Sequence, residues 1–155
     1  MDVGSEIGPV TGSPRPDFIT AYHDTLRAEL ARLASADAQT RPQYLQALGE
    51  EWLEASRRGV ATTLQLFVDG GMDVNYQDPR TGQSALHAAA GSGARQSVRT
   101  LLRTVHCDFL VRDSAGRLPS ECAYLFGHDV ALARLLGNKE RKQAAELVVS
   151  IARRP

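Results

Sequence analysis

The feature that most constrains this chain is a spacing of thirty-four residues that recurs along its middle. Gly59, Gly93 and Gly127 stand at this spacing, and Gly116 follows Gly82 at the same distance. A self-similar period of roughly 33 residues is typical of proteins that stack one turn and two helices per copy. A single copy cannot bury its own apolar face, so the copies must pack side by side into an elongated array.

The second copy, residues 79–113, carries the most informative motif. It reads Gly82-x-Ser84-Ala85-Leu86-His87-x-Ala89-Ala90-x-x-Gly93 and continues with Val98, Leu101 and Leu102. This string resembles the G-x-T-P-L-H-x-A-A-x-x-G-H pattern of the ankyrin repeat family. The first copy matches that family best at its end, Gly71-Met72-Asp73-Val74-Asn75, and the third copy matches at its turn and at Gly127-His128. The chain is thus similar to ankyrin repeats over about three copies, residues 50–137.

The resemblance implies an all-α fold, an ankyrin-repeat solenoid with extra N-terminal helices and a C-terminal capping helix. Each copy would supply a turn, an inner helix, an outer helix and a hairpin finger. Gly59, Gly93 and Gly127 would follow the inner helices, where φ can be positive without a Cβ clash. His87 occupies the histidine position of the family motif, which implies a structural hydrogen-bonding role between neighbouring turns.

The flanks divide into three segments. Residues 1–16 contain three glycines and three prolines and are predicted to be a flexible leader, with a secretion signal of a bacterial effector as the alternative. Residues 17–155 are predicted to form a single domain. Within it, residues 17–49 form an N-terminal helical cap, residues 50–137 the repeats and residues 138–155 a C-terminal helix.

Apolar residues on the first flank recur every three or four positions, which predicts an amphipathic helix over residues 17–34. Its apolar side consists of Phe18, Tyr22, Leu26, Leu30 and Leu33. We expect this side to cover the end of the repeat stack, because a terminal repeat exposes an apolar face. The alternative is an exposed helix that binds a partner. A second helix is predicted over residues 40–58.

Composition excludes several classes of function. Eighteen basic and eighteen acidic residues give no net charge, which argues against a nucleic-acid or anionic-membrane partner. The start of the chain lacks the features of a secretory signal, and Cys107 and Cys122 lie in different copies. We therefore expect free thiols and a cytoplasmic protein.

The sequence offers no convincing catalytic, cofactor-binding or metal-binding site. His106, Cys107, Cys122 and His128 invite a zinc interpretation, but they lack the paired C-x-x-C spacing of such sites. The Gly91-Ser92-Gly93 segment lies between two helices rather than after a strand, which is not the context of a phosphate loop. The expected class is a non-catalytic protein–protein interaction module.

Carried over by motif position, the family's partner contacts fall on the fingers and the concave side of the inner helices. The positions implied here are Arg57, Arg58, Gln77, Arg80, Arg112, Arg117, Leu125 and Phe126. Arginines in such a row suit an acidic or mixed segment of another protein, with the two apolar residues as its anchor. The alternative is that the arginines are ordinary solvated residues and that Leu125 and Phe126 lie under the C-terminal helix. We expect a monomeric adaptor or inhibitor, and alternatively a self-associating protein that uses its terminal helices.

Overall fold

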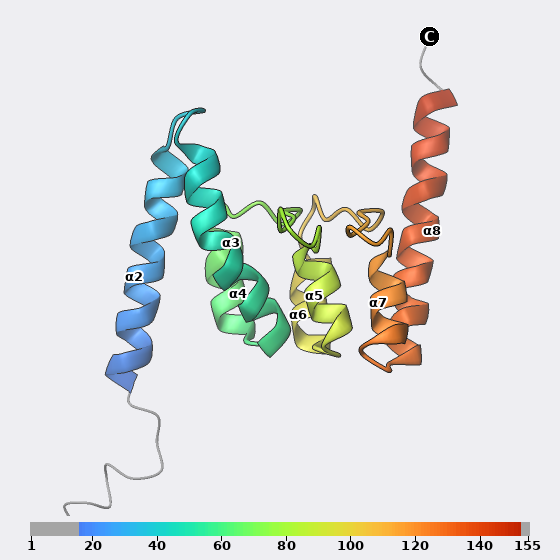
Figure 1. The fold of residues 1–155 in the computed structure, drawn as a ribbon, viewed down its shortest axis with the longest axis horizontal. Helices are drawn as coiled ribbons and strands as arrows, with labels where there is room; N and C mark the ends of the chain where they lie inside the picture. Colours follow the sequence, from blue (N-terminus) through green and yellow to red (C-terminus); the bar gives the residue numbers. More distant parts are fainter. Residues whose placement is uncertain (1–15, 153–155) are drawn as a thin grey trace, which may run out of the picture.

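The computed structural model describes residues 16–152, which form seven helices and no strand (Figure 1). The helices are α2 (Pro16–Ser35), α3 (Arg41–Arg58), α4 (Ala61–Asp69), α5 (Ala85–Gly91), α6 (Arg95–Leu102), α7 (Pro119–Leu125) and α8 (Val130–Ala152). The predicted all-α class is confirmed. The expected leader, residues 1–16, lies outside the described residues apart from Pro16, at which α2 begins.

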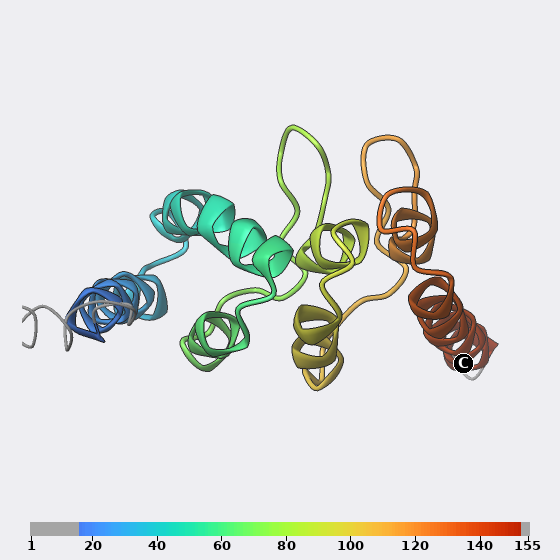
Figure 2. The ribbon, with the colours of Figure 1, turned by 90° about the horizontal axis from the view of Figure 1, so that it is seen from below.

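The helices lie in two rows (Figure 2). The inner row consists of α3, α5 and α7, and the outer row of α4, α6 and α8, with α2 beside α3 and α4 at the N-terminal end. The loops before α5 and α7 project beyond the inner row. We call residues 71–84 the first finger and residues 104–118 the second finger. This is the elongated stack that the thirty-four-residue period predicts.

Local sequence signals explain where the helices begin and end. The Ser84 hydroxyl accepts a hydrogen bond from the His87 backbone N–H at 3.4 Å and so caps the start of α5. Gly59 and Gly93 have φ values of +73° and +66°, as predicted for residues that follow inner helices. The same prediction is wrong for Gly127, because after the inner helix of the third copy the positive φ falls at His128, at +50°.

Gly127 is required for a different reason. A Cβ at this position would run into the carbonyl oxygen of Ala90, in the copy before, and would lie 3.0 Å from that of Ala123. Only a residue without a side chain allows this close approach of two backbones. The equally spaced glycines are therefore required for two different reasons. The first two adopt a left-handed backbone conformation, and the third allows two backbones to pack closely.

The core runs through the middle of both rows. Trp52 and Phe67 are fully buried, and their ring centroids lie 5.4 Å apart between α3 and α4. The predicted apolar side of α2 is only partly covered. Leu26, Leu30 and Leu33 are buried, whereas Phe18 is 76% exposed because the start of α2 extends past the start of α4 (Figure 1).

The last helix is longer than the sequence indicates. A separate helix was expected from residue 138, yet α8 runs unbroken from Val130 to Ala152. A glycine such as Gly137 destabilises a helix by about 1 kcal/mol relative to alanine. Hydrogen bonds made by the residues that follow Gly137 offset this cost. The Glu140 carboxylate accepts from the Ser120 N–H at 3.0 Å and from its hydroxyl at 2.6 Å, and the Gln143 side chain accepts from the Phe109 N–H at 2.7 Å.

Both α2 and α8 reach the length of a bilayer span, but their charged residues make them too polar for one. No helix within residues 16–152 is long and apolar enough to cross a membrane.

Candidate functional site

The residues implied by the family motif lie on the inner helices and on the two fingers. Arg57 and Arg58 are in the last turn of α3, Gln77 and Arg80 in the first finger, Arg112 and Arg117 in the second finger, and Leu125 and Phe126 at the end of α7. These elements form one side of the molecule, which we call the concave side (Figure 2). Charge, rigidity and exposure differ sharply along this side.

At the α3 end, every arginine has a carboxylate neighbour. Glu54 pairs with Arg57 at 3.3 Å and with Arg58 at 2.8 Å, and Arg80 approaches Glu50 at 3.7 Å. All these side chains are largely exposed, so the pairs are weak and easily exchanged. Their charges are mixed rather than purely basic, and they line an open depression of about 560 Å³.

Arg117, in the second finger, is held much more firmly. Its Nε donates to the Asp113 carboxylate at 2.9 Å, and its backbone N–H donates to the same carboxylate at 2.9 Å. The Ala115 N–H adds a third hydrogen bond at 3.0 Å, and the Asp113 side chain is fully buried. Burial alone would raise the pKa of Asp113, but the hydrogen bonds from Arg117 outweigh it and lower the pKa. The pair therefore stays ionised and fixes Arg117 in place.

The fixed guanidinium in turn positions an aromatic ring. The Arg117 Cζ lies 4.8 Å from the centre of the Phe126 ring, within the range of a cation–π contact. Phe126 remains 50% exposed. Gly91, at the end of the preceding inner helix, presents no side chain beside it, since a Cβ there would lie 3.8 Å from that of Phe126. An exposed, oriented aromatic surface results.

Leu125 does not join Phe126. It is also 50% exposed, but it lines a groove between α7 and α8 at the C-terminal end of the stack. The two adjacent apolar residues thus serve different surfaces. The expectation that Leu125 and Phe126 together anchor one partner segment therefore applies only to Phe126.

The remaining predicted residues bond within the fingers. The Gln77 side-chain amide donates to the Gly82 carbonyl at 2.9 Å and to the Arg112 carbonyl at 3.0 Å, so it links the first finger to the second. The Arg112 guanidinium donates to the Gly116 carbonyl at 2.7 Å. The tips are joined as well, because the Ser114 N–H donates to the Thr81 carbonyl at 2.9 Å. The fingers therefore form one linked platform.

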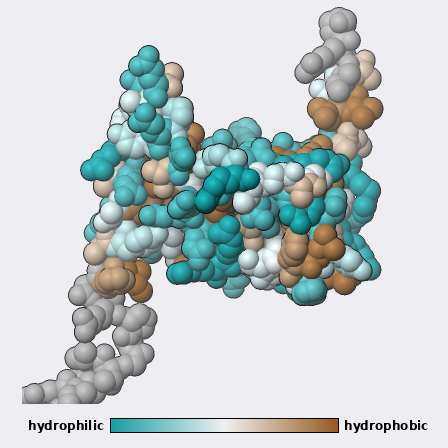
Figure 3. All heavy atoms as spheres, in the orientation of Figure 1, coloured by the Kyte–Doolittle hydropathy of each residue, from teal (hydrophilic) through white to brown (hydrophobic). Residues whose placement is uncertain are grey.

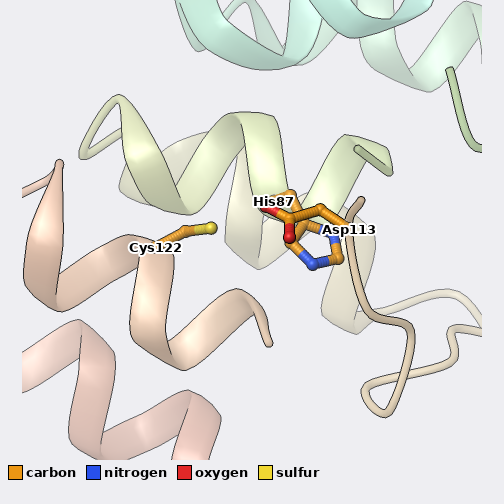
Figure 4. Close-up of side chains that lie close together, drawn as sticks. All are labelled: His87, Asp113 and Cys122. Atoms are coloured by element: carbon orange, nitrogen blue, oxygen red, sulfur yellow. The ribbon is translucent and has the colours of Figure 1, made fainter. Parts of the chain in front are cut away.

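A buried cluster of His87, Asp113 and Cys122 lies beneath the second finger (Figure 4). The possible ligand atoms of these residues lie within 4.8 Å of one another. The His87 Nε2–H donates to the Arg117 carbonyl at 2.8 Å, and its Nδ1 accepts from the Ser84 hydroxyl at 2.8 Å. His87 and Asp113 are therefore engaged in hydrogen bonds that hold the second finger, and burial raises the pKa of the Cys122 thiol to about 11.

The residues of the zinc alternative are scattered. His106 and His128 are exposed, whereas Cys107 and Cys122 are buried free thiols. Within residues 16–152, these four side chains do not form a group with converging ligand atoms. Burial raises the pKa of the Cys107 thiol to about 11, which keeps it protonated at neutral pH.

Sequence reasoning missed three contributors to this surface. Asp113 is not among the positions implied by the motif, although its spacing of four residues from Arg117 is a usable signal for an ion pair. Glu50 and Glu54 lie one helical turn apart on the exposed side of α3, and they were not assigned to the concave side. Their carboxylates neutralise the basic row that the arginines alone would form.

Comparison with known families agrees with this architecture. The family model described as ankyrin repeats matches three copies over residues 52–145, which extends into α8 beyond the end expected from the motif. No curated protein matches the chain.

Proposed function

Because the chain belongs to the ankyrin repeat family, whose members are generally non-catalytic interaction modules, we propose that it binds a segment of another protein on its concave side. The observation that carries this proposal is the exposed Phe126 ring, held against Arg117 by a buried carboxylate. Arginine and aromatic residues dominate binding energy at protein interfaces. A preorganised pair of this kind loses little conformational freedom when a partner binds.

The partner segment that fits best has an apolar anchor residue and charges of both signs. The anchor would pack on Phe126 beside Gly91, where the inner row has no side chain to obstruct it. Further along, Glu54, Arg57 and Arg58 offer exchangeable charges. A strongly acidic partner is less well matched, because Glu50 and Glu54 would repel it.

A peptide selection tests this proposal. A phage library of random twelve-residue peptides is panned on the full chain, and the affinity of the enriched peptide is measured by calorimetry. We expect Phe126→Asp to weaken binding at least about tenfold, because the apolar anchor residue of the peptide loses the ring on which it packs. Phe18→Asp, on the exposed start of α2, is the matched control and should leave the affinity unchanged. Equal binding to the wild type and the Phe126→Asp variant would refute the concave side as the binding surface.

A further inference from the structure

The C-terminal end of the stack exposes a surface that is buried in the copy before. His87 and Ala90 are 1% and 0% exposed because the third copy packs over them. Thirty-four residues later, the same positions hold Glu121 and Tyr124, and both are exposed. Within the part of the chain that the structure describes, no further helix covers them (Figure 2).

This end face is a groove between α7 and α8 with a volume of about 520 Å³. Its apolar side chains are Tyr124, Leu125 and Val130, which are 60%, 50% and 55% exposed. Hydrophobic surface also gathers over the lower part of α7 in the view of Figure 3. Exposed apolar surface that is rimmed by charges marks interaction sites more often than ordinary solvated surface.

The groove has a charged end and an apolar end. The hydrogen bonds from Ser120 to Glu140 fix the start of α7 beside the middle of α8, which places Glu121 near Arg141. At the other end, the short connection of residues 126–129 brings the end of α7 beside the start of α8, so that Leu125 lies near Val130. The acidic residue of the groove, Glu121, is on α7, and its two basic residues, Arg134 and Arg141, are on α8.

We propose that the end face binds a second copy of this chain, so that α7 of each copy lies against α8 of the other. A two-fold axis parallel to these helices brings Glu121 opposite Arg141 of the second copy. It also brings Tyr124 and Leu125 opposite Val130 of the second copy. Each contact occurs twice, which is the self-complementarity that a symmetric interface requires.

Two further properties favour a second copy as the occupant. The chain carries no net charge, so association meets no long-range repulsion. The α8 side of the groove also presents Ala133, a small and only partly buried residue, which leaves room for the Tyr124 ring of the second copy. Because Phe126 packs toward Arg117 instead, the concave side stays free in the dimer. The proposal is therefore independent of the proposed function.

Sedimentation equilibrium of the full chain tests the proposal directly. We expect the wild type, of 16.8 kDa, to double its mass as its concentration rises through the micromolar range. Glu121→Arg and Arg141→Glu should each weaken dimerisation at least about tenfold, because each creates two like-charge contacts per dimer. A wild type that remains monomeric up to about millimolar concentration refutes the proposal.

Mixing the two single variants gives the sharpest result. The arginine introduced at position 121 of one chain faces the glutamate introduced at position 141 of the other, while the native Arg141 faces the native Glu121. We expect the mixture to form a heterodimer within about threefold of the wild-type affinity, although each variant alone dimerises at least about tenfold more weakly than the wild type. This recovery also demonstrates that both variants are folded. A mixture that stays monomeric contradicts the proposed pairing.

The apolar part of the interface has its own control. Tyr124→Asp should abolish dimerisation, because it places a charge in the apolar half of the groove. Tyr44→Asp changes another partly exposed tyrosine, on α3 at the opposite end of the stack, and should leave dimerisation unchanged. Equal weakening by both substitutions would contradict the assignment of the end face.

Discussion

The two fingers share the same turn chemistry but hold their arginines very differently. Asp78 accepts from the Arg80 N–H at 2.8 Å, and Asp113 accepts from the Ala115 N–H at 3.0 Å. Beyond that, the Arg80 side chain is 80% exposed and its closest carboxylate contact is 3.7 Å. The Arg117 side chain is 31% exposed and lies 2.9 Å from a fully buried carboxylate. One finger presents an adaptable charge, and the other presents a fixed one.

The two arginines occupy different positions of the repeat, because the residue thirty-four positions before Arg117 is Gln83, and the fingers also differ in how they are tied to the inner row. His87, in α5, donates to the Arg117 carbonyl and so ties the second finger to the inner row. Thirty-four residues earlier, the same position holds Leu53, whose side chain has no donor for the first finger. At this position the second finger therefore has a hydrogen bond to the inner row that the first finger lacks, in addition to the Asp113 bonds, and it is the second finger that positions Phe126.

Replacing the carboxylates of Asp113 and Asp78 should give the largest difference in stability between the two fingers. Asp113→Ala leaves three N–H donors unsatisfied and strands Arg117, and we expect it to lower the free energy of unfolding by about 3 kcal/mol. Asp78→Ala removes one backbone hydrogen bond and a distant ion pair, and we expect a loss of about 1 kcal/mol. Urea unfolding at neutral pH measures both. Equal losses would mean that the two fingers are held alike.

Replacing the arginines should give a smaller contrast in the same direction. Arg117→Gln deprives the buried Asp113 of its counter-charge, and we expect a loss of about 2 kcal/mol in the free energy of unfolding. Arg80→Gln removes only weak, solvated contacts, so we expect less than about 0.5 kcal/mol. Thermal unfolding of the two variants side by side provides the measurement. A cost at Arg80 as large as that at Arg117 would contradict the distinction.

The buried His87, which donates a hydrogen bond to the Arg117 carbonyl, predicts a modest dependence of stability on pH. Burial lowers the pKa of His87 and outweighs the opposing effect of its hydrogen bond to Arg117. The unfolded chain therefore binds the proton more readily, so stability is complete above about pH 6.5 and declines as pH falls below it. His87→Gln should remove this decline between about pH 6.5 and 5, as followed by urea midpoints. A parallel decline in wild type and variant would assign the effect to other groups.

Much of the fold was predictable from the sequence, because the turn and packing residues recur at a fixed period. The motif around Leu86 and His87 determined the helix pair, and Gly59 and Gly93 adopt the expected positive φ. Sequence failed where distant contacts decide the local structure. Gly137 stays helical because Glu140 and Gln143 bond to segments about 20 and 34 residues away.

The candidate site was less predictable than the fold. The motif assigns Arg80 and Arg117 to the same surface, since nothing in the local sequence indicates that Arg117 pairs with a fully buried carboxylate while the Arg80 side chain is open to solvent. The separation of Leu125 from Phe126 depends on the direction in which α7 ends, and that direction is set by packing against Gly91 and α8. Exposure and ion pairing at a surface depend on tertiary contacts, so they are difficult to predict from a single sequence.

The central claim is that the concave side is the binding surface and that the second finger positions its main contact residue, Phe126. The most direct test is a titration of the ¹⁵N-labelled chain with the enriched peptide, followed by amide chemical shifts. We predict that the perturbed amides cluster at Gly91, Ser92, Arg117 and Phe126 and extend toward Arg58. Perturbations confined to the groove between α7 and α8, or to α2, would contradict the claim.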